Sequence, residues 1–437
     1  MIGSVVPTNR RFLVAAGVFL FWTLVFAAAY AHWPLYSENQ NTKFLHGLAW
    51  AGVGTLGEDW LANTIDPLPA FSLLVYGTER FLHQSLFYVY QALLLGTYLF
   101  SLVGIADEVF SLKGTRVGIV LFSLFVITLH ASLAPPFSMQ VLGTSLGWLL
   151  QAGVANQYLF NPVFQPASVG VLLVLAIYLF LRGHPFWAVT SAAIAALFHS
   201  TYLPSAGAFT AGYMLMTWLS PEPSPPGPPN LGGTRGCNQA KPGTASSRIG
   251  GRWAESPAWL RSLAMGILAL AIVSPVLLYN ALVLEPTSAE LWARAQEIIV
   301  VDRIPHHSLP AVWVDNTVYA KIGIVVLALI VIRHSRLLPI LLFPAVVAIV
   351  LTWVQMKTDS DLLAFIAPWR ISVFLVPLST AMLAAWAIGG LCNRYAAQVN
   401  RYQIPILVVA GILLAFVAVE GIQATRNAFV ARRQSDS

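Results

Sequence analysis

Charged residues are scarce in this chain of 437 residues. Asp, Glu, Lys and Arg make up only 10% of the sequence, whereas hydrophobic residues make up 57%. In soluble domains about 25% of residues are charged. This composition excludes an ordinary soluble domain, and we expect no nucleic-acid partner.

Cysteine is nearly absent as well. The two cysteines, Cys237 and Cys392, both fall on the cytoplasmic side of the predicted topology, where disulfides do not persist. Their spacing is not that of a metal-binding pair. The sequence therefore predicts neither a disulfide nor a cysteine metal site.

Long apolar runs dominate the chain instead. A run of this kind can cross a hydrocarbon core of ~30 Å, and about eleven of them predict an all-α, polytopic transmembrane helical bundle. The predicted spans are Phe12–Tyr30, Gln84–Ile105, Val117–Leu133, Ala167–Leu181, Pro185–Phe198, Tyr202–Leu219, Ser262–Leu282, Thr317–Ile332, Leu337–Val354, Ile371–Leu391 and Ile404–Val419. The segments Pro69–Val75 and Val141–Leu150 are shorter, and we interpret them as interfacial or re-entrant.

The loops predict the orientation. Arg10 and Arg11 precede the first span, which places the N-terminus in the cytoplasm. The loops that then face the cytoplasm are all basic, and twelve of the 18 acidic residues fall in the outer loops 31–83, 284–316 and 355–370. With eleven spans the basic tail from Arg426 lies outside, which would be explained by one miscounted helix. The Arg10-Arg11 pair resembles a twin-arginine signal, but a retained first helix is the preferred interpretation.

A segment rich in proline, glycine and serine divides the chain. Residues Ser220–Arg252 contain almost no bulky apolar side chain, so they cannot form a core. The sequence therefore predicts an N-terminal membrane half (1–219, about six helices), a disordered cytoplasmic linker (220–257) and a C-terminal membrane half (258–437, about five helices).

The first outer loop, Tyr36–Asp66, is a polar island in this apolar chain. If Glu38–Trp50 forms an interfacial helix, Asn39, Lys43 and His46 share one face. Such a face could donate hydrogen bonds to an anionic headgroup. The alternative is an ordinary amphipathic surface helix with a solvated face.

Two acidic motifs follow in the same loop. Gly52–Gly57 matches a dinucleotide-binding string, but no βαβ unit precedes it, so it predicts a flexible turn. Asp59, behind Glu58, and Asp66 could hold a divalent cation through oxygen ligands, or one could act as a general base. Alternatively, both aspartates cap helices.

A second outer segment, Leu284–Thr317, opens with a capping-box pattern at Thr287 that predicts a helix through Ile299. Arg303 follows and could grip a phosphate with two hydrogen bonds. His306 and His307 could shuttle a proton or bind metal, and separate roles are favoured because adjacent residues of an extended chain point apart. The alternative is a solvated loop.

Two further ionisable residues lie at outer helix ends. His199 separates two predicted spans, and Arg370 opens another. An ionisable group at membrane depth is a candidate functional residue, although Arg370 could snorkel and His199 could bind a backbone carbonyl. The uncharged loop Pro135–Gln165, rich in amides and aromatics, could line a cavity for sugars.

The layout of a first helix leading into a large acid-bearing outer loop resembles the GT-C membrane glycosyltransferases. The run Phe164–Tyr213 also resembles bacterial GT-C-like and O-antigen-polymerase-like proteins, and the likeness covers about half the chain. The resemblance implies a catalytic carboxylate in the first outer loop that deprotonates an acceptor hydroxyl. Glu38 corresponds best by position, with Asp59 and Asp66 behind it, although these enzymes usually carry Asp where this chain reads Ser37-Glu38-Asn39.

The same resemblance implies a sugar donor linked to polyprenyl phosphate, in the cytoplasmic (inner) membrane of a bacterium. Arg303 or Arg370 would hold the lipid phosphate, assisted by Lys43 and His46, and a divalent cation is a possible cofactor. The main alternative is a transporter or flippase, which should carry ionisable groups near the bilayer midplane and paired broken helices. Charges inside the predicted spans are nearly absent, which disfavours ion-coupled transport. A non-catalytic envelope scaffold is the third alternative.

Overall fold

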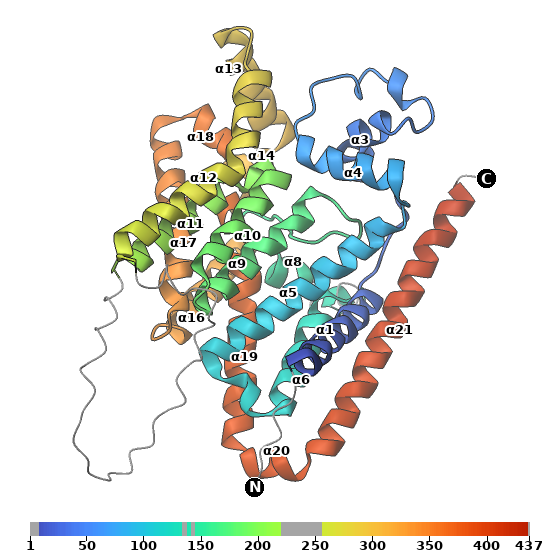
Figure 1. Ribbon diagram of the computed structural model, residues 1–437, viewed down its shortest axis with the longest axis vertical. Coiled ribbons are helices and arrows are strands. Elements are labelled where there is room, and N and C mark those ends of the chain that lie inside the picture. Colours follow the sequence, from blue (N-terminus) through green and yellow to red (C-terminus); the bar gives the residue numbers. More distant parts are fainter. Residues whose placement is uncertain (1–7, 133–137, 141–144, 220–255, 436–437) are drawn as a thin grey trace.

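The computed structural model describes residues 8–132, 138–140, 145–219 and 256–435. Within these residues every regular element is a helix and there is no strand (Figure 1), which confirms the all-α fold. Most of the predicted linker, Cys237 and part of Pro135–Gln165 lie outside the described residues.

All eleven predicted spans are helical, but eleven membrane crossings are not confirmed. Among the residues that the structure describes, six stretches are long and apolar enough to cross a membrane. They are α1 (Thr8–Ala29), α5 (Leu86–Phe110), α12 (Ala258–Val283), α17 (Leu337–Thr358), α21 (Gln403–Ser435) and the run Asp361–Arg394, which ends in α19 (Leu375–Arg394).

The other predicted spans form shorter helices. These are α6 (Arg116–His130), α9 (Val171–Leu181), α10 (Pro185–Phe198), α11 (Leu203–Leu219) and α16 (Asn316–Val331). An α-helix rises 1.5 Å per residue, so the 11 residues of α9 reach only about half of a ~30 Å hydrocarbon core.

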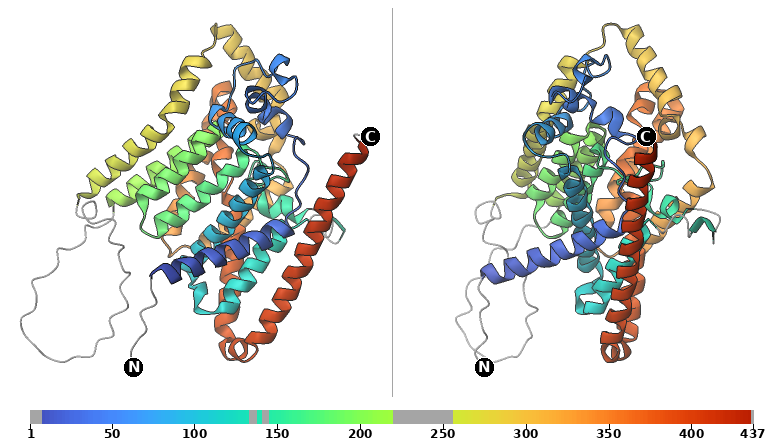
Figure 2. Two further views of the ribbon diagram at one scale, coloured as in Figure 1. Left: turned by 45° about the vertical axis from the view of Figure 1, so that its right-hand side comes forward. Right: turned by 90° about the vertical axis from the view of Figure 1, so that its right-hand side faces the viewer.

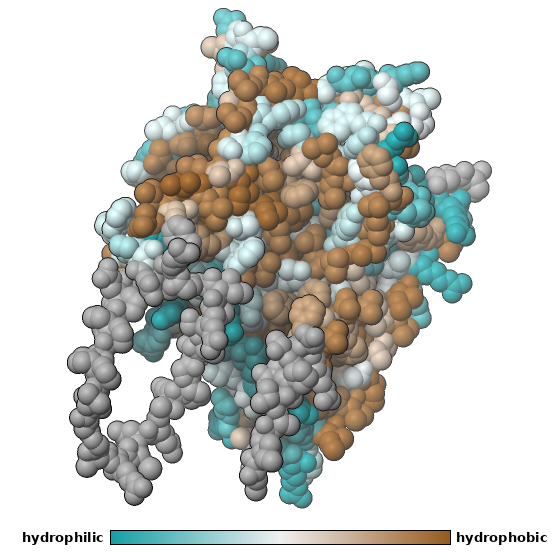
Figure 3. Space-filling view, viewed as in Figure 1, coloured by the Kyte–Doolittle hydropathy of each residue, from teal (hydrophilic) through white to brown (hydrophobic). Residues whose placement is uncertain are grey.

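The two halves of the chain pack into one bundle. Helix α12, from the second half, lies against α10 and α11 of the first, and α19 lies against α5, α6 and α16 (Figures 1 and 2). An aromatic contact crosses the junction, since the Phe209 ring in the first half lies 4.6 Å from the Phe374 ring in the second. Large apolar side chains cover broad areas of the surface (Figure 3), as expected for a protein whose solvent is lipid.

One end of the bundle carries ion pairs between short connections. Arg182 pairs with Glu108 at 2.6 Å and Lys113 with Asp107 at 2.9 Å, and α20 (Ala396–Arg401) lies at this end (Figure 1). The opposite end, here called the site end, carries α2 (Gln40–Lys43), α3 (Leu45–Trp50), α4 (Pro69–Phe81) and α13 (Ala289–Glu297). The predicted inner and outer loops named here therefore separate in space.

At the site end the structure differs from two local predictions and agrees with a third. The helix predicted over Glu38–Trp50 is broken at Phe44, whose ring is fully buried and separates α2 from α3. Helix α13 is capped by Ser288, which accepts a hydrogen bond from the Leu291 N–H at 3.1 Å, rather than by the predicted Thr287. Gly52 and Gly54 adopt left-handed φ values of 77° and 55°, which agrees with the predicted turn.

Helix α21 returns alongside α1, and the two backbones approach most closely at Gly421. A Cβ at this position would overlap the backbone of Ala28 and Ala29, whereas Gly411 in the same helix has open space around it. Beyond this crossing, the Thr425 hydroxyl accepts a hydrogen bond from the His32 N–H at 3.0 Å. Small residues at such crossings permit close helix packing.

Replacing Gly421 with Val should therefore destabilise the protein by about 1–3 kcal/mol, because α21 must move away from α1. The measurement is thermal unfolding of the detergent-solubilised protein. The matched control, Gly411→Val, should leave the melting temperature nearly unchanged. Equal losses in both variants would contradict the tight α1–α21 crossing.

Candidate functional site

The first outer loop folds onto the site end through a buried aromatic cluster. Phe44 contacts Phe71, Phe87 and Phe164, with ring centroids between 4.8 and 6.5 Å apart. The buried Gln40 side chain donates to the Phe164 carbonyl at 2.8 Å and accepts from the Tyr36 N–H at 2.7 Å. These contacts fix α2, and with it Lys43, against the end of the bundle.

Five basic residues from distant segments converge at the site end; Lys43, His199, Arg303, His307 and Arg370 are here called the basic cluster. Burial, followed by the charges of Arg303 and Arg370, lowers the pKa of Lys43. Burial, Lys43 and Arg370 lower the pKa of His199 to about 3. Burial and Arg370 lower the pKa of His307 to about 4. Arg370 thus lies close to three other members of the cluster.

Short helices hold these side chains in place. Arg370 lies in η7 (Pro368–Ser372), which contacts both η4 (Ser200–Tyr202) and α14 (Pro305–Ser308). The His199 ring meets the Tyr202 ring at 5.1 Å, and the Tyr202 hydroxyl donates to the Ala167 carbonyl at 2.8 Å. Arg303 is exposed at the end of η6 (Ile298–Arg303) and reaches the cluster from its edge.

The positive charges of the basic cluster outnumber the carboxylate beside them, Asp66. Among the described residues, no carboxylate forms an ion pair with Lys43, Arg303 or Arg370. Nε of Arg370 and Nδ1 of His199 are buried without a hydrogen-bond partner. Burying unpaired charge is costly, and guanidinium groups bind phosphate oxygens well. The arrangement is therefore suited to binding an anion.

Asp66 is the carboxylate whose charge acts on the basic cluster. Its negative charge opposes the lowering of the Lys43 pKa. The side chain is 6% exposed. Oδ1 accepts from the Leu68 N–H at 2.8 Å and lies 3.8 Å from Nδ1 of His46, while Oδ2 is buried without a partner. Asp66 thus combines burial, proximity to a cation and one unused acceptor oxygen.

The other two predicted carboxylates lie in different settings. Glu38 is exposed, has a left-handed φ of 47° and makes no side-chain hydrogen bond with the described residues. Asp59 accepts from the N–H groups of Leu61 and Ala62 at 2.8 and 3.2 Å, and thus stabilises a turn rather than the helix that was considered from the sequence. In the described part of the chain, no group of three or more His, Cys, Asp and Glu is placed to hold a metal ion.

The remaining candidate residues contact different parts of the structure. Asn39 donates to Oε1 of Gln165 at 3.2 Å. His46 turns into the loop interior, where Nε2 lies 3.2 Å from the Thr64 carbonyl. His306 is exposed, with its ring 4.1 Å from that of His307. The two histidines lie in α14 rather than in the extended chain that was assumed.

Left-handed backbone conformations cluster near these residues. Glu38 (φ 47°) lies five residues before Lys43, and Ala367 (φ 50°) directly precedes η7, which carries Arg370. Asn156 (φ 63°) follows Ala155, whose carbonyl binds His307. Strained conformations of non-glycine residues are often found at functional sites, so the backbone supports the same location.

The sequence interpretation missed the buried lysine of α16. Lys321 has no exposed surface, and its ammonium group donates a hydrogen bond to Oδ1 of Asn156. The signal was present in the sequence, because a lone charge inside a predicted apolar span is itself a candidate functional residue.

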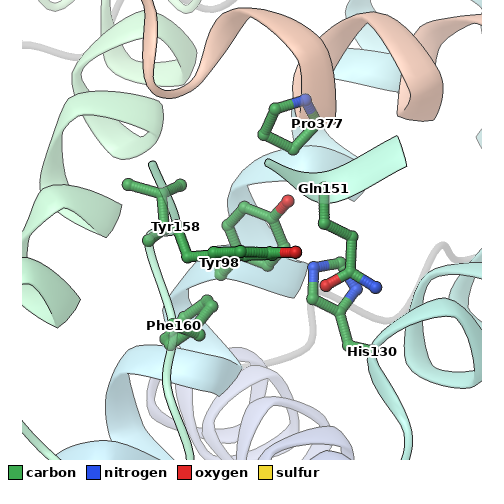
Figure 4. Close-up of a pocket in the computed structure, with 7 residues that line it drawn as sticks. Tyr98, His130, Gln151, Tyr158, Phe160 and Pro377 are labelled. Carbon is green, nitrogen blue, oxygen red and sulfur yellow. The ribbon is translucent and has the colours of Figure 1, made fainter. Parts of the chain in front are cut away.

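A small polar cavity lies deeper in the bundle (Figure 4). Its volume is about 10 Å³, and Tyr98, His130, Gln151 and Tyr158 line it together with apolar residues. Nδ1 of His130 is hydrogen-bonded to the Val126 carbonyl at 2.9 Å. A space of this size holds about one water molecule. It is therefore too small for a substrate.

The chain matches no family model, no curated protein and no solved structure. The resemblance to GT-C enzymes therefore rests on the layout of the sequence alone.

The affinity of the basic cluster for an anion should depend on the protonation of Lys43. Because the Lys43 pKa is lowered, its ammonium group loses the proton at a lower pH than an exposed lysine does. We expect the affinity for sulfate, which stays fully ionised, to fall as the pH rises through this lowered pKa. Calorimetric titration of the protein in nanodiscs between pH 7 and 10 measures the effect. The Lys43→Arg variant should lose this pH dependence, and identical profiles would refute the role of Lys43.

Proposed function

We propose that this protein is a membrane glycosyltransferase that binds the phosphate of a lipid-linked sugar in the basic cluster. The observation that carries the proposal is that Lys43 and Arg370 lie near each other at the site end and that neither forms an ion pair with a carboxylate of the described residues. A phosphate group bound there would supply the missing negative charge. It would also use the Nε donor of Arg370 that has no partner in the protein.

The surroundings of the cluster suit a substrate with a hydrocarbon tail. The hydroxyl of Tyr279, in α12, donates to the backbone carbonyl of Asp66 at 2.8 Å. On either side of this contact, the side chains of Ile65, Leu278 and Leu282 are 52%, 60% and 76% exposed. Exposed apolar groups next to a polar site favour a lipid ligand over a free phosphate. In this proposal the lipid tail lies along α12 while the phosphate enters the cluster.

Asp66 is the proposed general base. It would accept the proton of the acceptor hydroxyl as that oxygen forms a bond to the anomeric carbon of the donor sugar. The bond between the anomeric carbon and the phosphate oxygen breaks, and the lipid phosphate leaves with the electron pair. Lys43 and Arg370 would stabilise the charge that develops on this leaving group. Glu38, the first candidate by sequence position, is an exposed residue and is not assigned the role.

The general-base role predicts a separation between catalysis and binding. Asp66→Asn should reduce sugar transfer about 10²–10⁴-fold, because the amide cannot take up the proton but still accepts from the Leu68 N–H. Affinity for polyprenyl phosphate should change little. The assay uses purified protein in nanodiscs, a panel of polyprenyl-phosphate hexoses and alkyl-glycoside acceptors.

Asp59→Asn is the matched control and should retain activity, since Asp59 stabilises a turn. Unchanged transfer in Asp66→Asn would exclude Asp66 as the base. Tight lipid-phosphate binding without transfer of any sugar in the panel would favour the flippase alternative instead.

A further inference from the structure

A tight turn, residues 153–157, connects the basic cluster with the buried lysine of α16. The Gly153 N–H donates to the Gln157 carbonyl at 2.7 Å, and the Asn156 N–H donates to the Gly153 carbonyl at 2.9 Å. Gly153 lies close to the backbone of Val373, since a Cβ built at this position would be 3.0 Å from Cα of Val373. The turn is thus packed against the segment that follows Arg370.

Two groups fix this turn from opposite sides. On one side, the buried ammonium group of Lys321 binds the amide oxygen of Asn156, which holds the left-handed conformation that asparagine tolerates well. On the other side, the Ala155 carbonyl accepts a hydrogen bond from Nδ1 of His307 at 2.8 Å. Lys321, Asn156, Ala155 and His307 therefore form one continuous chain of contacts.

This contact determines the tautomer of His307. A backbone carbonyl can only accept, so Nδ1 must carry the hydrogen. Burial and the charge of Arg370 disfavour a second proton, and the pKa of about 4 keeps the ring neutral at physiological pH. In a neutral ring with hydrogen on Nδ1, Nε2 carries a lone pair and acts as an acceptor.

We propose that Nε2 of His307 accepts a hydrogen bond from a hydroxyl of the acceptor molecule, and that Lys321 positions His307 through Asn156. The inference rests on the proposed function for the identity of the ligand, a hydroxyl-bearing acceptor. An acceptor group suits this position because the charged members of the basic cluster, Lys43, Arg303 and Arg370, are donors that would bind the phosphate. Asp66 remains the group that takes the proton, and His307 orients the hydroxyl.

The first test observes the ring directly. The full-length protein is labelled with ¹⁵N-histidine in lipid bilayers, and the His307 signals are assigned from their loss in His307→Asn. At neutral pH we expect Nδ1 to be protonated and Nε2 to be unprotonated. Methyl glucoside should shift the Nε2 signal saturably, whereas dimethyl sulfoxide, which has no hydroxyl, should not. A proton on Nε2, or no saturable shift with the glucoside, would overturn the assignment.

The second test concerns positioning. Asn156→Gly keeps the left-handed turn but removes the amide that binds Lys321, and Lys321→Met removes the ammonium group. Both should convert His307 from one tautomer into a mixture. Asn156→Asp should preserve the wild-type signal because its carboxylate still accepts from Lys321. An unchanged tautomer in Asn156→Gly would show that Lys321 does not position His307.

A kinetic test separates this inference from the proposed function. In His307→Asn, the side-chain amide can still donate to the Ala155 carbonyl, but it has no hydrogen-bond acceptor at the position of Nε2. The KM for the acceptor should rise roughly tenfold, the loss of about one hydrogen bond. An unchanged acceptor KM would refute the role of His307 while leaving glycosyl transfer intact. If no sugar is transferred but the glucoside-dependent shift is present, the result contradicts the proposed glycosyltransferase activity and still supports hydroxyl binding at His307.

Discussion

Positive charge held at the end of an apolar bundle without a matching carboxylate is the constraint on which the rest of this structure depends. Lys43 and Arg370 come from separate segments and are partly buried near each other, and the neutral rings of His199 and His307 lie close to Arg370. Such an arrangement opposes folding unless something else holds it together. Here the aromatic cluster around Phe44 and the packing of η7 against η4 and α14 supply that stabilisation. The proposed phosphate site would thus be formed before any phosphate binds.

The two halves of the chain are both needed for this arrangement. Lys43 and His199 come from the first half, whereas His307 and Arg370 come from the second. Helix α12 packs against α10 and α11 and is also hydrogen-bonded through Tyr279 to the loop that carries Asp66. A change in the packing of the halves would therefore alter the distance between the basic cluster and the proposed base. This dependence explains why the site lies where loops of both halves meet.

The sequence predicted the helices well because their signal is local: each long apolar run became a helix, most of them within a few residues of the predicted ends, although α21 continues to Ser435, well past the predicted end at Val419. It also identified Lys43, His199, His307 and Arg370 as candidates, since charges are rare in this chain. It could not rank the carboxylates, because the difference between Asp66 and Glu38 is one of burial and neighbours that only the fold creates. Phe44 likewise broke a predicted helix because burial among distant rings outweighs local periodicity. Lys321 was missed although its charge within an apolar run was visible.

The central claim is that the basic cluster binds the phosphate of a lipid. Native mass spectrometry of the intact protein with polyprenyl phosphate and with the corresponding polyprenol, which has the same tail but no phosphate, tests it most directly. The account predicts that the phosphate lipid binds, that the alcohol does not compete with it, and that Arg370→Gln weakens binding while Arg336→Gln, exposed and outside the cluster, does not. Equal binding of the two lipids, or undiminished binding by Arg370→Gln, would contradict the account.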